Sequence, residues 1–124
     1  MAGIITTIAG YGAIGYSGGG YSGDGGPATL ATIYYPSGLA VDTAGNIYIA
    51  DVDNYAVRKV TKSTGIITTV AGTGSYGLGT GDGGLATLAT LNTPSGVAID
   101  AMDNIYIADY GNNNIRLISS STGD

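Results

Sequence analysis

The sequence predicts an all-β fold made of two consecutive four-stranded antiparallel meanders. Glycine accounts for 23 of the 124 residues and apolar residues for 44%, a composition typical of a turn-rich protein with enough apolar surface for a core. Short motifs also recur along the chain: GDGG, PSG and NIYIAD each occur twice, 58 residues apart, and GIITT occurs twice, 62 residues apart. Motifs that recur at a fixed spacing indicate repeated structural units.

Within the first unit, short apolar runs are separated by turn residues, as strands joined in a meander require. We expect strands at residues 39–42, 47–50, 56–60 and 66–71. These runs are apolar on both faces, so the sheet should be covered on both sides. A β-propeller provides this arrangement, because each four-stranded blade is packed between two other blades.

Residues 36–60 read PSGLAVDTAGNIYIADVDNYAVRKV and residues 94–118 read PSGVAIDAMDNIYIADYGNNNIRLI. Both segments resemble NHL repeats, in the bacterial form that also carries an IITTVAG strand and a GDGGPA loop. The resemblance implies propeller blades whose PSG strand lies nearest the central channel and whose IITTVAG strand lies outermost. It also implies six blades in a closed ring. The two repeats differ locally, for example where Gly45 is replaced by Asp103.

These features divide the chain into five segments. Residues 38–72 should form the first blade, and residues 96–124 a second blade that lacks its own outer strand. Residues 11–37 and 73–95 should form glycine-rich loops, the first rich in tyrosine, each with a short helical turn, which we place at residues 27–32 in the first loop. Residues 1–10 should form an outer strand that completes a blade of another copy.

The outer strand is the basis for expecting self-assembly. Its residues match residues 66–71 except at one position, and they are Ile4, Ile5, Thr6, Thr7, Ile8 and Ala9. An unpaired strand and an unpaired sheet edge both favour pairing with another chain. We therefore expect a head-to-tail homotrimer with six blades, with two or four chains or an open filament as alternatives. Whether the chain is a natural subunit or an excised or engineered fragment stays open.

Acidic and basic residues recur at the same spacing in both units. Asp51 and Arg58, like Asp109 and Arg116, are seven residues apart across a hairpin, so we expect each pair to form a structural latch. A calcium loop at residues 51–54 is a weaker interpretation, because the second unit lacks the middle carboxylate. The GDGG loops containing Asp24 and Asp82 should form turns, with anion binding as the weaker alternative.

Five tyrosines lie in or beside the first long loop, namely Tyr11, Tyr16, Tyr21, Tyr34 and Tyr35. Tyrosines on glycine-rich loops combine an apolar ring with a polar hydroxyl. We expect them to pack over a blade edge or a subunit interface, with contact to a protein or glycan ligand as the alternative.

Composition excludes several function classes. The net charge is −5 with only four basic residues, which argues against nucleic-acid partners. Histidine and cysteine are absent, and no unique acidic cluster is present, so we predict no catalytic residue, metal site or cofactor. No signal peptide or membrane span is recognisable in the sequence, and no compartment is predicted. The leading hypothesis is a structural or interaction scaffold and not an enzyme, although propellers related to NHL repeats include lactonases and lyases.

Overall fold

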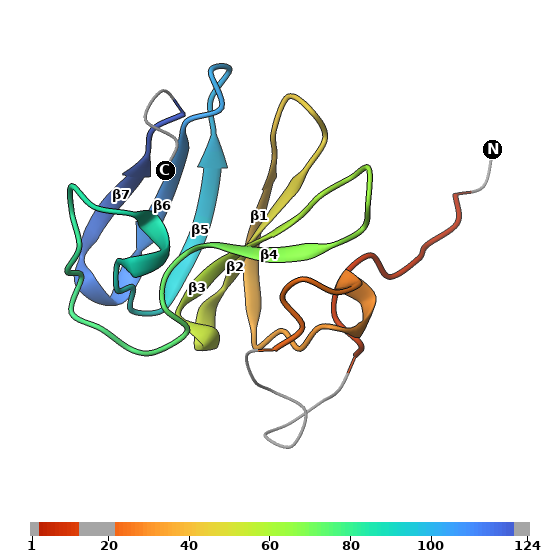
Figure 1. Cartoon of the computed structure of the whole chain (residues 1–124), viewed down its shortest axis with the longest axis horizontal. Coiled ribbons are helices and arrows are strands. Elements are labelled where there is room, and N and C mark those ends of the chain that lie inside the picture. The colour runs from red at the N-terminus through yellow and green to blue at the C-terminus, as the bar shows by residue number, and fades with distance from the viewer. Residues whose placement is uncertain (1–2, 13–21, 121–124) are drawn as a thin grey trace.

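The computed structural model describes residues 3–12 and 22–120, and it contains two antiparallel sheets that pack against each other (Figure 1). In the first sheet the strands lie in the order β1-β2-β3-β4. These strands are β1 (Pro36–Val41), β2 (Ile47–Asp51), β3 (Ala56–Val60) and β4 (Ile67–Ala71). The second sheet has the order β5-β6-β7, and its strands are β5 (Pro94–Ile99), β6 (Ile105–Asp109) and β7 (Asn114–Ile118).

The helices found in the described part of the chain are all three-residue 3-10 turns. They are η1 (Ala28–Leu30), η2 (Val52–Asn54), η3 (Ala86–Leu88) and η4 (Tyr110–Asn112). Since the two sheets are the main structure and these turns are short, the predicted all-β fold is confirmed. None of the helices in the described residues is long and apolar enough to cross a membrane.

Some element boundaries differ from the sequence-based expectation. Strand β1 begins at Pro36, not at residue 39, because Pro36 pairs with Asp51 across an irregularity in register before Gly38. Proline is tolerated there because its missing N–H is not needed at the start of a strand. Likewise β5 begins at Pro94, so each long loop ends before the predicted limit of residue 37 or 95.

The outermost strand and the helical turn also start later than expected. Strand β4 begins at Ile67, while Ile66 forms an isolated bridge with Pro27. Pro27 itself is extended, with φ −60° and ψ 132°, and caps η1 instead of occupying its first position. The predicted helical turn at residues 27–32 is thus reduced to three residues.

The core consists of two apolar clusters, one on each face of the first sheet. The cluster between the sheets contains Tyr48, Val57, Ala71, Leu91, Ile105 and Ile107. The other is built on the opposite face from Ala28, Ala31, Ile49, Val60 and Ile67. In both clusters, the loop that precedes a sheet covers that sheet's face, so each loop forms a wedge against its own blade.

Candidate functional site: blade latches and open blade faces

Arg58 is the centre of a buried latch in the first blade. Its Nη1 donates to Asp51 Oδ2 at 3.0 Å, and its Nε and Nη2 donate to Asp24 Oδ1 at 3.1 and 2.8 Å. The remaining donors reach the backbone carbonyls of Thr32 and Ser22 at 3.0 and 2.9 Å. All five guanidinium N–H groups are thus satisfied, and the arginine ties strands β2 and β3 to the wedge loop.

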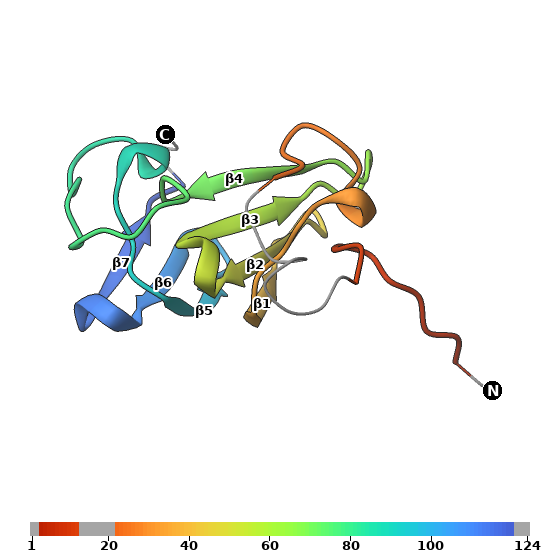
Figure 2. The same ribbon diagram turned by 90° about the horizontal axis from the view of Figure 1, so that it is seen from below.

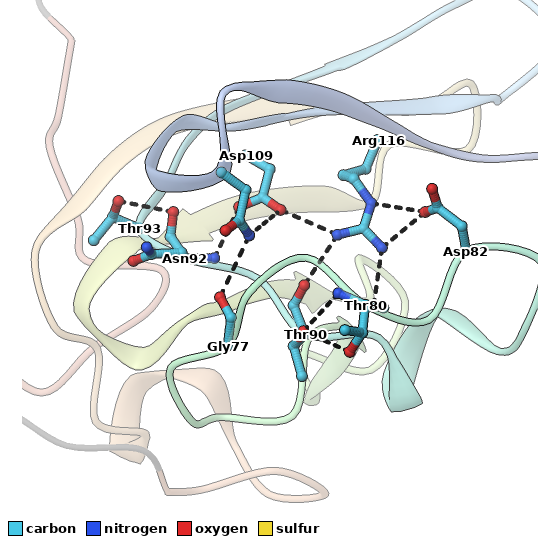
Figure 3. Close-up of polar contacts among 9 residues, drawn as sticks. Gly77, Thr80, Asp82, Thr90, Asn92, Thr93, Asp109 and Arg116 are labelled. Carbon is cyan, nitrogen blue, oxygen red and sulfur yellow. Dashed lines mark hydrogen bonds and ion pairs between the residues drawn. The ribbon is translucent and has the colours of Figure 1, made fainter.

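The second blade repeats this latch around Arg116 (Figure 3). Its Nη1 donates to Asp109 Oδ2 at 3.1 Å and to the Thr90 carbonyl at 3.0 Å. Its Nε donates to Asp82 Oδ1 at 3.0 Å, and Nη2 donates to the Thr80 carbonyl at 3.2 Å. The two latches are therefore built alike.

The structure brings together the residues that the sequence predicted as pairs and adds a second carboxylate to each. The GDGG loops of Asp24 and Asp82 were expected to form turns, with anion binding as the weaker alternative. Both aspartates lie 34 residues before their arginine. The repeat itself fixes this separation, so the sequence indicated a shared role for the two aspartates but not their contact with an arginine.

Asp51 is buried in the latch and saturated with hydrogen bonds. Burial raises its pKa, against the lowering effect of hydrogen bonds from Asn54 Nδ2, the Tyr34 N–H and Arg58. Because both carboxylate oxygens accept protein donors, the segment 51–54 is organised as a hydrogen-bonded turn. Within residues 3–12 and 22–120, no group of three or more Asp, Glu, His or Cys side chains could hold a metal ion.

A second repeated carboxylate organises the hairpin at the end of each innermost strand. Asp42 accepts hydrogen bonds from the N–H groups of Ala44 and Asn46, from Asn46 Nδ2 and from the Tyr48 hydroxyl, at 2.9 to 3.0 Å. Partial burial opposes ionisation of Asp42, but these hydrogen bonds outweigh it and lower its pKa. Burial and the bond to Asp42 raise the pKa of Tyr48.

The interface between the two sheets shows which side chains a blade uses to pack on the next one. Tyr48 and Val57 of the first blade are 6% and 0% exposed in this interface. Their equivalents in the second blade, Tyr106 and Ile115, are 38% and 68% exposed. We call this surface, with Leu117, the open face of the second blade.

The first blade has a corresponding open face on its other side. Val97 and Ile99 of the second blade pack into the interface. Their equivalents Leu39 and Val41 are 65% and 55% exposed. We call the surface around these two residues the open face of the first blade.

The innermost strands of the two blades approach closely at a pair of glycines. A Cβ added to Gly38 would lie 3.1 Å from the Gly96 Cα and 3.2 Å from the Ser95 carbonyl oxygen. A Cβ added to Gly96 would meet nothing within 4 Å among the described residues. A side chain at Gly38 would therefore crowd the neighbouring blade, whereas a Cβ on Gly96 would point into open space.

Residues 3–8, within the predicted outer strand, project away from both sheets (Figures 1 and 2). No strand pairing includes residues 3–9 in the described chain, and Ile4 and Ile5 are more than nine-tenths exposed. Among the described residues the segment is anchored at its end, where Ala9 packs on the second apolar cluster and the Gly10 N–H donates to the Ala28 carbonyl at 2.9 Å.

The predicted tyrosine cluster is only partly described. The rings of Tyr34 and Tyr35 stack with centroids 5.1 Å apart, and Tyr35 and Tyr11 are exposed. Tyr16 and Tyr21 lie outside the described residues. The Tyr34 N–H donates to Asp51 Oδ1, which ties this part of the loop to the first latch.

Comparison with protein families identifies the repeat. Residues 6–80 match the teneurin NHL domain, and residues 91–116 match the NHL repeat. The chain belongs to the NHL-repeat β-propeller family. NHL relatives include human Teneurin-4, which is 37% identical over 102 residues that cover 73% of this chain and 4% of that protein. Protein SUPPRESSOR OF QUENCHING 1, chloroplastic, from Arabidopsis thaliana is 32% identical over 74% of this chain and 8% of its own length.

Solved structures support the same fold for this NHL chain. A putative phosphatase from Bacteroides thetaiotaomicron superposes with a TM-score of 0.66 and 29% identity, covering 90% of this chain and 26% of that one. An auxiliary nutrient binding protein from Bacteroides ovatus gives a TM-score of 0.64 at 28% identity, over 80% of this chain and 26% of its own. The chain thus spans a small part of each relative's length.

Proposed function

We propose that this NHL protein is an interaction scaffold whose two-blade chains associate head to tail into a propeller ring. The observation that carries the proposal is the complementarity of the two open faces. The open face of the second blade carries Tyr106 and Ile115 at the positions where the first blade buries Tyr48 and Val57. The open face of the first blade carries Leu39 and Val41 at the positions of Val97 and Ile99, which pack against that buried pair. A second copy is therefore the partner whose chemistry fits both faces.

The energetics favour covering these faces. Leu39, Val41, Ile115 and Leu117 are each more than half exposed, although Ile49, Val57 and Ile107 of the same two sheets are buried. Contiguous exposed apolar surface of this kind typically marks an interaction site. A head-to-tail contact covers both faces of every copy at once when the rotation closes a ring. We expect three chains, because NHL propellers usually have six blades.

The proposed role is non-catalytic. NHL domains generally mediate protein interactions. In this chain, the aspartate at the end of the innermost strand recurs in both blades. Asp42 and Asp100 each accept hydrogen bonds from the loop that follows them. Such repeated, internally satisfied carboxylates support a structural role for these residues in each blade.

Native mass spectrometry and light scattering at micromolar concentration test the proposal. The expected mass is that of a trimer. Leu117→Glu and Leu39→Glu, one on each open face, should each convert it to monomers, because a buried unpaired carboxylate is strongly unfavourable. Leu78→Glu is the matched control, since Leu78 is 74% exposed and belongs to neither open face. A folded wild-type monomer would contradict the proposal.

The exposed tyrosines favour a second candidate, binding of a glycan or protein by the first loop. Tyr35 is 66% exposed and stacks on Tyr34, which presents an aromatic surface of the kind that contacts sugar rings. A glycan array with the wild type and Tyr35→Ala tests this candidate. Binding that is lost in the variant supports it, and a blank array contradicts the glycan form.

A further inference from the structure

A groove with a volume of about 600 Å³ lies beside the outer edge of β7. One wall is the GDGG loop at residues 81–84, and the floor is apolar. The floor residues are Ala86, Ala89, Leu91, Ile107 and Ile118. No strand of the described residues pairs with this edge of β7.

In the first blade the equivalent place is filled by β4. The Gly25 N–H donates to the Ile67 carbonyl at 2.8 Å, and the Ile67 N–H donates to the Gly26 carbonyl at 3.1 Å. The Ile67 side chain is fully buried in the apolar cluster with Ala28 and Ile49. The loop and the strand β3 thus hold β4 between them.

The second blade presents the same donors, acceptors and apolar floor. Gly83 and Gly84 are equivalent to Gly25 and Gly26, and the floor residues Ala86 and Ile107 are equivalent to Ala28 and Ile49. A polar group for the strand is also present in both blades. In the first blade, Thr69 Oγ1 of β4 donates to Asp24 Oδ2 at 2.6 Å. The side chain of Asp82, the counterpart of Asp24, is 83% exposed against 38% for Asp24.

We propose that this groove binds an extended Ile-Ile-Thr-Thr segment by strand addition, and that its occupant is residues 3–9 of a second copy. The choice of this occupant rests on the self-association proposed above. The sequence of the segment supports the choice, because residues 3–9 repeat residues 65–71 except that Ile8 replaces Val70. Strand addition supplies main-chain hydrogen bonds, and the alternate side chains supply specificity.

The position of the segment supports the same occupant. The Gly10 N–H donates to the Ala28 carbonyl at 2.9 Å, just as the Gly72 N–H donates to the Ala86 carbonyl at 3.0 Å. Strand β4 ends just before Gly72 and belongs to the blade that precedes the loop containing Ala86. By the same relation, residues 3–9 end just before Gly10 and belong with a blade that would precede the first blade in the ring. A copy that covers the open face of the first blade provides that blade.

The first blade also defines the register. Ile5 takes the place of Ile67, so its N–H and carbonyl pair with Gly84 and Gly83, and its side chain fills the apolar floor. Thr7 takes the place of Thr69 and donates to Asp82. Ile4 takes the place of Ile66 and lies opposite Leu85, as Ile66 lies opposite Pro27.

Cysteine cross-linking of the full chain tests the inference, because the wild type contains no cysteine. Chains with Ile4→Cys are mixed with mass-tagged chains with Leu85→Cys and oxidised. The register control replaces Ile4→Cys by Ile5→Cys, whose side chain faces the opposite side of the strand. The positive control is one chain with Pro27→Cys and Ile66→Cys, at the bridged pair of the first blade.

The expected result is about tenfold more mixed disulfide dimer for the Ile4→Cys pair than for the Ile5→Cys pair, since a one-residue slip reverses the side chains. Adding Thr7→Val should reduce this yield, whereas Thr6→Val, on the other face, should not. Equal or absent cross-linking by a chain that is trimeric in native mass spectrometry overturns the strand proposal and leaves the proposed function standing. A monomeric chain without cross-links overturns both.

Discussion

Thr43 of the first blade is bound to Asp103 of the second by two hydrogen bonds. The Thr43 N–H donates to Oδ1 at 3.1 Å and the Thr43 hydroxyl donates to Oδ2 at 2.7 Å. Asp103 has φ +63°, and its counterpart in the first blade is Gly45 at φ +88°. The counterpart of Thr43 is Ala101. This bond therefore belongs to the interface within one chain, and an interface between copies would lack it.

Thr43→Ala should lower the free energy of unfolding by about 1 kcal/mol, because an exposed hydrogen bond to a carboxylate is lost. Asp103→Ala should lower it further, since it also places alanine in a left-handed backbone conformation that aspartate and glycine tolerate better. Urea unfolding monitored by circular dichroism measures both effects. Thr68→Ala, at an exposed strand position, is the control. Equal stability of the Thr43 and Thr68 variants would show that the contact contributes nothing.

Arg58→Ala should be the most destabilising latch variant, by about 3 to 5 kcal/mol, because it leaves the buried Asp51 without its charged partner. Arg116→Ala should cost less, since its second partner, Asp82, is mostly exposed. Arg58→Lys should not restore stability, because an ammonium cannot reproduce the five-donor planar fork. Thermal unfolding reports the order, with Lys62→Ala as the control. An Arg58→Ala variant that unfolds at the same temperature as Lys62→Ala would contradict a structural latch.

The sequence was sufficient for features that are local or repeated. The strands were found from apolar runs between turn residues, and the Asp51–Arg58 pair from a seven-residue spacing across one hairpin. Asp24 was not assigned to the latch because its position depends on how a long loop returns over the sheet, which no local pattern specifies. The Thr43–Asp103 bond was missed for a different reason. It occurs where the repeats differ, and it requires knowing how two sheets pack.

The hairpin carboxylates should make stability fall in acid. Because the pKa of Asp42 lies below its ordinary value of 3.8 in the folded chain, its ionised form stabilises the fold at neutral pH. That stabilisation is complete above about pH 4 and is lost as the pH falls through the lowered pKa. Asp100, whose pKa is lowered by hydrogen bonds from Asn104, acts in the same direction.

The variant Asp42→Asn should accordingly be less stable than the wild type at pH 7, and the difference should shrink toward pH 2. Urea unfolding at a series of pH values measures this dependence, and Asp53→Asn in the η2 turn is the matched control. A constant difference across the series would mean that the loop does not depend on the charge of Asp42.

Substitutions at Gly38 and Gly96 should distinguish effects on the folding of one chain from effects on the assembly of several chains. Gly38→Ala should destabilise every chain by about 1 to 3 kcal/mol, because its Cβ would crowd the Gly96 backbone inside a packed interface.

Gly96→Ala should leave a single chain unaffected, since a Cβ there meets nothing within 4 Å in the described part of the chain. In the proposed ring, however, Gly96 of one copy faces Gly38 of the next. Gly96→Ala should therefore weaken the trimer in a dilution series followed by native mass spectrometry. Gly111→Ala, whose Cβ would collide with Asn92 of its own chain, should act on stability alone. Trimers of Gly96→Ala that dissociate at the same concentration as the wild type would place Gly96 outside any interface between copies.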